Sequence, residues 1–370
     1  MKLRNCTCNE FYERTQGKRV VAFGCGRFFK NELSVRHPEL ANKISYFIDN
    51  GKAGQICRHA GKQIPIYPVS YLEEDRQGDI VVLICVRSVE LSMEMYDELN
   101  TYNLPEDMEC YCAIIMLCEI VHYPKTAEYL RLLGEESRIN KVIHCFWFSG
   151  EEKPKLQQKC LESWRKFCPD YEIKEWNMKN YDVNKSKFMQ QAISKRKWAF
   201  ASDFARLDVI YRYGGIYMDL DVELIRGLDE VLHNKAFFSF DCSSNVDLGS
   251  GFGAVPRHPL VKELIDLYEN AEFVEKNDKI NDTPQPVVLK SAFEKRGLKR
   301  DGTLQKLENA LVYPAEYFSP VNFALFHTIT TPNTIGIHHY DDAWHSGAQS
   351  EEKQEKMRLA ERIKVLLAEN

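Results

Sequence analysis

Residues 198–223 (WAFASDFARLDVIYRYGGIYMDLDVE) constrain the fold more than any other stretch, because they combine a helix, a glycine turn and a strand. Apolar residues recur in the first half at three- and four-residue spacing, at Phe200, Phe204, Leu207 and Ile210. This spacing predicts a helix. Gly214-Gly215 then ends the helix and turns the chain, and the apolar run 216–218 predicts a short buried strand.

Charged residues occupy both halves of this stretch. Asp203 and Arg206 stand three apart, so they share one face of the predicted helix. Asp219-Leu220-Asp221 follows the predicted strand, and in an extended chain the two carboxylates project to the same side. Carboxylates placed side by side at a buried strand end repel each other unless a cation lies beside them.

Oxygen ligands suit a hard cation, so the pair predicts a site for Mn²⁺ or Mg²⁺ at Asp219 and Asp221. The competing interpretation of an isolated D-x-D is a solvated acidic loop. The buried strand, the Gly-Gly turn and the helix with its Asp/Arg pair favour the metal site.

These residues resemble the core of glycosyltransferase family 32, which has a "D-x-x-R … Y-G-G-I-Y-x-D-x-D" block and a GT-A fold. The same block occurs in large clostridial glucosylating toxins. The resemblance implies that Asp203 and Arg206 hold the donor sugar and its phosphates. It also implies that Asp219 and Asp221 serve the ribose and the metal, so these four residues are the candidate catalytic residues.

Two further segments match the same family. Residues 142–148 resemble a first strand with the pattern "I-H-x-x-W-x-G", which implies that Trp147 stacks on the donor base; a core tryptophan is the alternative. Residues 334–344 resemble a terminal "H-H-x-x-x-S-W" segment, which implies a metal-binding histidine and a donor contact at Trp344. His338 is the predicted ligand and His339 the fallback, because neighbours on a strand cannot both face the metal.

The glycine-rich stretch 245–259 follows a predicted strand at 236–240 and also resembles a family turn. Asp241 and Asn245 are candidate donor contacts there, and Asp247 could contact a donor or acceptor hydroxyl. A strand end followed by a turn would use the same residue types.

Composition limits the class of protein. The chain has 370 residues, 44% hydrophobic and 28% charged, which suits a globular protein with two domains. The formal net charge of −5 argues against nucleic acid as a partner. The N-terminus lacks an apolar signal region, so we expect a cytoplasmic protein whose twelve cysteines are reduced.

Residues 18–87 alternate apolar runs with helical stretches, which predicts a small doubly wound parallel sheet. Gly24, Gly26 and Asp49 follow the order of a nucleotide-binding Rossmann unit, but Phe29 stands where the third glycine would be. These residues therefore mark either a weak nucleotide site or, as we favour, a tight turn in a scaffold domain.

The predicted fold class is α/β, with a GT-A type nucleotide-diphospho-sugar transferase domain preceded by a smaller Rossmann-like parallel α/β domain. The expected boundaries are 1–122 for the Rossmann-like domain, 123–140 for the connection, 141–348 for the transferase domain and 349–370 for an amphipathic helix. Residues 88–140 are expected to be mainly helical. That last helix packs on the protein's own body or, alternatively, attaches to the inner membrane surface.

The sequence as a whole predicts a metal-dependent, retaining glycosyltransferase. Its donor would be a UDP- or GDP-linked sugar and its acceptor a glycan or lipid-linked saccharide, in bacterial capsule or surface-polysaccharide synthesis. Two alternatives stay open: a protein-modifying glycosyltransferase, and a non-catalytic subunit that binds a nucleotide sugar.

Overall fold

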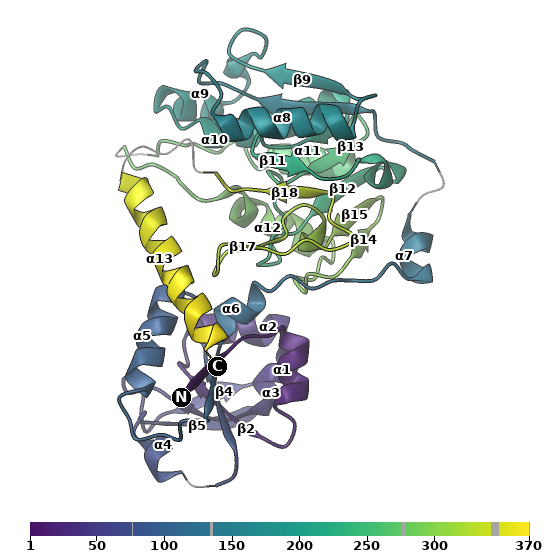
Figure 1. Cartoon of the computed structure of the whole chain (residues 1–370). Coiled ribbons are helices and arrows are strands. Elements are labelled where there is room, and N and C mark those ends of the chain that lie inside the picture. The colour runs from purple at the N-terminus through teal and green to yellow at the C-terminus, as the bar shows by residue number, and fades with distance from the viewer. Residues whose placement is uncertain (76, 134–135, 276–277, 342–347, 370) are drawn as a thin grey trace. The chain divides into compact units, whose positions relative to one another are not determined.

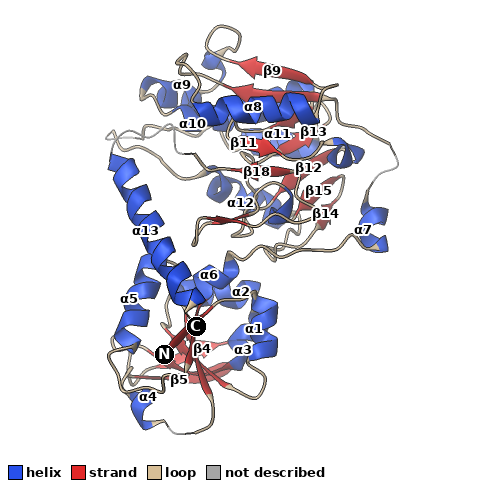
Figure 2. Ribbon diagram, in the orientation of Figure 1, coloured by secondary structure: helices blue, strands red, loops and turns tan. Residues whose placement is uncertain are grey.

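The computed structural model describes residues 1–75, 77–133, 136–275, 278–341 and 348–369. It divides the chain into two compact units, each with its own sheet, drawn in red in Figure 2. The first unit comprises residues 1–121, 322–327 and 348–370, and the second comprises residues 122–321 and 328–347. Figure 1 marks both chain termini in the first unit.

The first unit has a seven-stranded sheet in the order β1-β7-β6-β2-β3-β5-β4. All neighbours are parallel except β4 and β5. Its strands are β1 (Lys2–Arg4), β2 (Arg19–Phe23), β3 (Ile44–Ile48), β4 (Ile56–His59), β5 (Lys62–Tyr67), β6 (Ile80–Ile84) and β7 (Glu109–Cys112). The predicted parallel sheet is confirmed, with strand order reversing beside β2 as in doubly wound folds.

The helices of the first unit surround this sheet (Figure 2). They are α1 (Cys8–Arg14), a π-helical turn η1 (Phe29–Leu33), α2 (Ser34–Arg36), α3 (Pro38–Lys43), α4 (Tyr71–Glu74), α5 (Val89–Leu99), α6 (Ala113–Leu117) and α13 (Ala348–Ala368). The C-terminal helix α13 contacts β1, and Arg362 pairs with Asp97 of α5.

The expectation of mainly helical structure across 88–140 is wrong at β7. Its four residues, ECYC, contain no valine or isoleucine, so neither composition nor periodicity marks a strand. Cys110 and Cys112 are nonetheless buried, because β7 lies inside the sheet between β1 and β6.

The second unit has a seven-stranded sheet in the order β14-β15-β12-β13-β10-β8-β9. Its strands are β8 (Val142–Phe146), β9 (Glu172–Trp176), β10 (Gly215–Tyr217), β12 (Ala236–Ser239), β13 (Phe252–Ala254), β14 (Gln305–Leu307) and β15 (Ala310–Tyr313). Strands β9, β8, β10, β12 and β15 run in one direction, while β13 and β14 run against it. A separate antiparallel pair joins β11 (Val222–Leu224) to β18 (Gly336–His338).

Helices cover both faces of this second sheet (Figure 1). The helices of this unit are α7 (Ala127–Leu132), α8 (Lys155–Phe167), α9 (Lys187–Ser194), α10 (Trp198–Tyr213), α11 (Pro259–Asp266) and α12 (Gln285–Lys295). Short 3₁₀ turns are η2 (Val183–Lys185), η3 (Asp229–His233) and η4 (Ala315–Tyr317), and the two remaining strands are β16 (Val321–Asn322) and β17 (His327–Thr328).

Strand alternation divides the core of the second unit into two layers. Tyr217 packs among residues of α9, α10, α11 and α12 on one face. Ile216 and Met218 pack on the other face, with residues of α8 and of the β11–β18 pair. Each strand residue therefore faces one of two separate cores. The predicted α/β fold class, with two large and mostly parallel sheets, is confirmed.

Candidate active site

Two glycines set the path of the chain into the D-x-D segment. Gly214 ends α10 with φ +67° and Gly215 begins β10 with φ +95°, both in the left-handed region. A Cβ on Gly215 would lie 2.6 Å from the carbonyl oxygen of Val142, and one on Gly214 would lie 2.7 Å from Pro256. Both positions of the turn therefore require glycine, because of their backbone angles and because neighbouring atoms leave no room for a Cβ.

His144 holds this turn from the neighbouring strand. It is 1% exposed, its Nε2 lies 3.0 Å from the Gly214 oxygen, and the indole of Trp176 donates to its Nδ1. Burial lowers the pKa of His144 to about 4, so the ring is neutral and Nε2–H donates to Gly214. His144 of the "I-H" pattern thus supports the site without reaching it.

Three predicted metal ligands converge at the end of β10. One ligand atom each from Asp219, Asp221 and His338 lies within 4.8 Å of the others. His338 Nε2 is 3.3 Å from Asp221 Oδ1, and the backbone N–H of Asp341 donates to Asp221 Oδ2 at 2.8 Å. His339 points elsewhere, with Nε2 2.9 Å from the Glu223 carboxylate. Of the two neighbouring histidines, the structure therefore brings His338 to the carboxylates.

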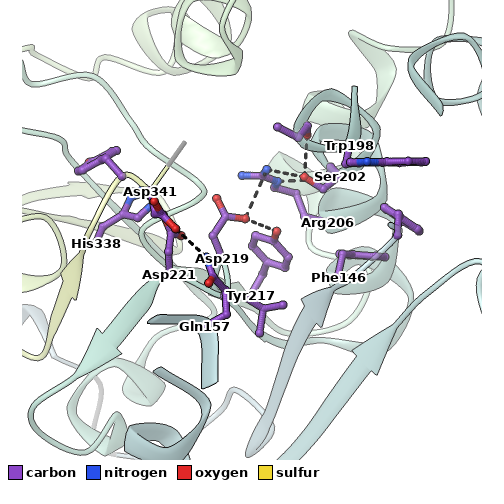
Figure 3. A pocket seen from close by; sticks show the side chains of 14 residues that line it. Phe146, Gln157, Trp198, Ser202, Arg206, Tyr217, Asp219, Asp221, His338 and Asp341 are labelled. Carbon is purple, nitrogen blue, oxygen red and sulfur yellow. Dashed lines mark hydrogen bonds and ion pairs between the residues drawn. The ribbon is translucent and has the colours of Figure 1, made fainter. Parts of the chain in front are cut away.

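Asp219 is held on its other side by α10 and β10, as Figure 3 shows. The hydroxyl of Tyr217 donates to Asp219 Oδ1, and the Arg206 guanidinium lies 3.6 Å from the same oxygen. A Cβ on Gly249 would lie 2.3 Å from Asp219 Oδ2. A glycine is thus required where the backbone passes the Asp219 carboxylate.

Arg206 is 5% exposed and fixed by its own helix. It donates to the oxygen and hydroxyl of Ser202, one turn earlier, and lies 3.2 Å from Asp203. Its guanidinium also stacks 4.8 Å from the Tyr217 ring centroid. The nearby carboxylates outweigh the cost of burial and raise the pKa of Arg206, so the cation is permanent.

Asp203 lies behind Arg206. Burial, opposed by Arg206 and reinforced by Asp219, raises the pKa of Asp203 to about 7. Its backbone oxygen accepts from Gln285 Nε2, so Gln285 of α12 anchors this turn of α10. Asp203 is not among the described residues that line the cavity, so the structure brings this predicted donor contact to Arg206 and not to the cavity wall.

A cavity of about 170 Å³ opens over these groups (Figure 3). Its polar wall includes Arg206, Asp219, Asp221, His338 and Asp341, and aromatic rings form the opposite side. Those rings are Phe146, Phe148 and Trp198. Gln157 of α8, whose amide donates to Asp341 at 3.0 Å, also lines the cavity. Gln157 and Trp198 were not predicted as site residues, because no motif in the sequence marks either of them.

The structure does not bring every predicted donor contact to this cavity. Trp147 is 6% exposed and packs in the core shared with α8, and its indole donates to the Glu151 oxygen at 2.6 Å. The reason is strand alternation: Phe146 and Phe148 face α10 and the cavity, so Trp147 between them faces away.

Asp241 and Asn245 bond to each other in the turn after β12, and Arg300 donates to Asn245 Oδ1 at 2.6 Å. Neither residue is among the described residues that line the cavity. Trp344 falls outside the residues that the structure describes.

The glycines of the first unit occupy a tight turn. Gly24 has φ +98°, and a Cβ there would lie 3.4 Å from the Cys85 oxygen at the end of β6. Asp49 accepts from the Gly51 N–H within its own turn, and Lys52 donates to the Cys25 oxygen. The Cβ of Gly26 would meet nothing within 4 Å. These contacts form a tight turn, and the weak nucleotide site at Gly24, Gly26 and Asp49 stays a prediction.

Asp247, a weaker candidate in the sequence, lies beside His338. Its Oδ2 is 3.1 Å from His338 Nδ1 and accepts from the Tyr340 hydroxyl at 3.0 Å, while Oδ1 accepts from the Gly249 N–H. Burial opposes ionisation of Asp247, but these hydrogen bonds outweigh it and lower the pKa of Asp247 to about 2. Asp221 and Asp247 likewise outweigh burial and raise the pKa of His338 well above its ordinary value.

The donor set fits a divalent cation. Two carboxylates and an imidazole can converge on one point, and they are the ligand types that Mn²⁺ accepts. The carboxylate side chains are 30% and 12% exposed, so the site is partly enclosed but reachable from the cavity.

Part of the chain is similar to known glycosyltransferases. Residues 154–238 match the family described as "Glycosyltransferase sugar-binding region containing DXD motif". Over 140 residues the chain is 31% identical to inositol phosphoceramide mannosyltransferase 1 of Schizosaccharomyces pombe, covering 36% of this chain and 43% of that protein. Human alpha-1,4-N-acetylglucosaminyltransferase is 38% identical over 78 residues, covering 21% of this chain and 22% of its own length.

The chain thus spans less than half the length of these relatives. Among solved structures, one titled "PaToxG Glycosyltransferase" aligns with a TM-score of 0.36 and 15% identity, over 56% of this chain and 77% of that chain. The matched residues include Asp203, Arg206, Asp219 and Asp221, so the predicted resemblance is confirmed: over residues 154–238 the chain is similar to glycosyltransferases that contain this DXD region.

Proposed function

We propose that this protein is a divalent-metal-dependent glycosyltransferase that moves a hexosyl group from a nucleotide sugar to a hydroxyl group of an acceptor. The observation that carries the proposal is the convergence of Asp219, Asp221 and His338 on the wall of a cavity that Arg206 also lines. A cation site beside a permanent positive charge is what a diphosphate requires.

The protein's own side chains have distinct roles in this proposal. Asp219, Asp221 and His338 would hold the cation. Arg206 supplies positive charge toward the donor phosphates, while Ser202 and Asp203 fix its guanidinium. Phe146, Phe148 and Trp198 offer ring faces for the base or the sugar, since stacking tolerates any nucleobase. When bound, the divalent cation would act as a Lewis acid that stabilises negative charge on the leaving diphosphate.

The relatives support the donor and acceptor classes. Two are named for transfer of mannose to inositol phosphoceramide or of N-acetylglucosamine, so we propose a hexosyl or N-acetylhexosaminyl donor. The acceptor is then a glycan or a lipid-linked saccharide. Retention of anomeric configuration, a role in bacterial capsule synthesis and a cytoplasmic location stay predictions from the sequence.

The rival function is a non-catalytic subunit that binds a nucleotide sugar. The side chains that would hold a metal and diphosphate are all present and mutually oriented, which favours the enzyme. Binding without turnover would favour the rival.

The test is hydrolysis of UDP- and GDP-sugars with Mn²⁺, measured as released nucleoside diphosphate. We compare the wild-type protein with Asp221→Asn, which removes a ligand charge. The matched control is Asp229→Asn, which alters a carboxylate bonded to Tyr171 and Lys141 away from the cavity.

We expect Mn²⁺-dependent hydrolysis in the wild-type and control proteins, and a decrease of about 100-fold or more in Asp221→Asn. Thermal stabilisation by a nucleotide sugar without any turnover would instead indicate the binding subunit. Full activity in Asp221→Asn would refute the metal assignment.

A further inference from the structure

The carboxylate of Asp247 accepts three hydrogen bonds in the loop between β12 and β13. Oδ2 faces both His338 Nδ1, at 3.1 Å, and the Tyr340 hydroxyl, at 3.0 Å, and Oδ1 accepts from the Gly249 N–H at 2.9 Å. Tyr340 is fixed in turn by Ser319, 2.5 Å from its hydroxyl. The Asp247 side chain is 13% exposed and His338 is 7% exposed, so the contact is shielded from water.

The direction of the hydrogen bond to His338 follows from chemistry. An ionised carboxylate can only accept, so Nδ1 must carry the hydrogen. A metal bound at this site would replace the hydrogen on Nε2, which is the nitrogen that lies 3.3 Å from Asp221. A metal-bound histidine commonly has its second nitrogen fixed in this way.

The same loop also sets the position of the other carboxylate. The Asp219 backbone N–H donates to the Gly249 oxygen at 2.9 Å, and Gly249 in turn donates to Asp247. The absent side chain of Gly249 leaves room for Asp219 Oδ2. Residues 247–249 therefore connect His338 on β18 with Asp219 after β10.

We propose that Asp247 is a positioning residue that fixes the tautomer and orientation of His338, so that Nε2 faces the point shared by Asp219 and Asp221. The inference rests on the proposed function, because it concerns how this chain presents a ligand to the divalent cation. Asp247 is not among the described residues that line the cavity, so this role involves no contact with donor or acceptor.

Asparagine has nearly the same shape as aspartate, but its NH₂ group donates hydrogen bonds where a carboxylate oxygen accepts them. If Oδ1 of the new amide accepts from Gly249, its NH₂ group faces both His338 Nδ1 and the Tyr340 oxygen. That arrangement satisfies every group only when Nδ1 accepts and Nε2 carries the hydrogen, which blocks metal binding. Alanine leaves a gap instead, where a water molecule can accept from Nδ1.

A purely structural role and a positioning role therefore predict opposite orders of Mn²⁺ affinity for the Asp247→Asn and Asp247→Ala variants. If Asp247 only packs, the isosteric Asp247→Asn should be milder than Asp247→Ala in every assay. If Asp247 sets the tautomer of His338, Asp247→Asn should lower the stability less than Asp247→Ala does, but should weaken Mn²⁺ binding more.

The experiment titrates the full-length proteins with Mn²⁺ alone and follows free Mn²⁺ by electron paramagnetic resonance, beside thermal unfolding. A second readout is the spin-echo modulation from a directly bound imidazole nitrogen at saturating Mn²⁺. The matched control is Glu316→Gln: Glu316 is 1% exposed and lies 2.9 Å from His122 Nδ1 in the same unit, but does not line the cavity.

We expect Asp247→Asn to raise the Mn²⁺ dissociation constant about 10- to 100-fold and to lose the nitrogen modulation. Asp247→Ala should lose less affinity, and Glu316→Gln should lower the unfolding temperature while retaining both metal readouts. Wild-type affinity and modulation in Asp247→Asn would overturn the inference while leaving the proposed function intact. Failure of the wild-type protein to bind Mn²⁺ would refute the metal site itself, and the inference with it.

Discussion

Replacing Gly249 with alanine should separate the stability of the fold from the geometry of the site. The new Cβ would lie 2.3 Å from Asp219 Oδ2 and 3.2 Å from His338 Cε1. The carboxylate oxygen must retreat by about 1 Å to reach an ordinary van der Waals contact. Because Asp219 is otherwise held by Tyr217 and Arg206, its carboxylate must turn away from the position these bonds define.

The expected magnitude follows from that displacement. A misplacement of about 1 Å can reduce turnover on the order of 100-fold, which corresponds to about 2.7 kcal/mol of activation free energy. The free energy of unfolding should change by less than about 1 kcal/mol, because the φ angle of Gly249 lies outside the left-handed region and suits alanine.

The assay combines Mn²⁺ affinity, Mn²⁺-dependent hydrolysis of a nucleotide sugar, and urea unfolding. Gly336→Ala is the matched control, because its Cβ would meet Val222 at 3.3 Å and Phe318 at 3.4 Å but neither metal-binding carboxylate. We expect the control to keep wild-type activity. Undiminished affinity and turnover in Gly249→Ala would show that Asp219 does not need the position seen in the structure.

Three other predictions concern pH, stability and donor binding. Because the pKa of Asp203 is raised to about 7 in the folded protein, against about 3.9 in an unfolded chain, the metal-free protein should lose up to about 1.4 kcal/mol of stability per pH unit as the pH rises from about 4 to about 7, and no more above 7. Urea unfolding at pH 5.5 and 8.5 should show this decline in the wild-type protein and its absence in Asp203→Asn. Neither ring nitrogen of buried His258 has a partner in the described structure, and burial lowers its pKa to about 4. His258→Leu should therefore raise the free energy of unfolding by about 1–2 kcal/mol and reduce the loss of stability between pH 6.5 and 4; an unchanged pH profile would contradict this reasoning. Phe148→Ala should raise KM for the nucleotide sugar about 10-fold, whereas Trp147→Phe should lower the unfolding temperature at unchanged KM; the opposite pattern would restore Trp147 as the stacking residue.

Local patterns in the sequence predicted the central part of the site. The spacing of apolar residues predicted α10, and the glycine pair predicted its end. Asp219 and Asp221 do come together as expected, but in a turn after β10, where the Asp219 oxygen accepts from the Val222 N–H, and not in an extended strand. These features depend on neighbours within a few residues, so one sequence is enough to predict them. The same holds for the parallel strands β2, β3 and β6, which are continuous apolar runs.

Contacts between distant segments could not be predicted in this way. His338 and Asp247 are separated by 91 residues, and neither position alone indicates the other. The side of the sheet that Trp147 faces depends on which helix covers which face, and strand alternation gives two possible answers until the topology is known. Gln157 reaches the cavity because α8 packs across the sheet beside β11, which is again a tertiary contact.

The most direct test of the central claim is anomalous scattering from a crystal of this protein soaked with Mn²⁺ and a nucleotide sugar. We expect an anomalous peak within bonding distance of Asp219, Asp221 and Nε2 of His338, with the donor diphosphate on the side of Arg206. A manganese peak elsewhere in the cavity, with these three side chains directed away from it, would contradict the account.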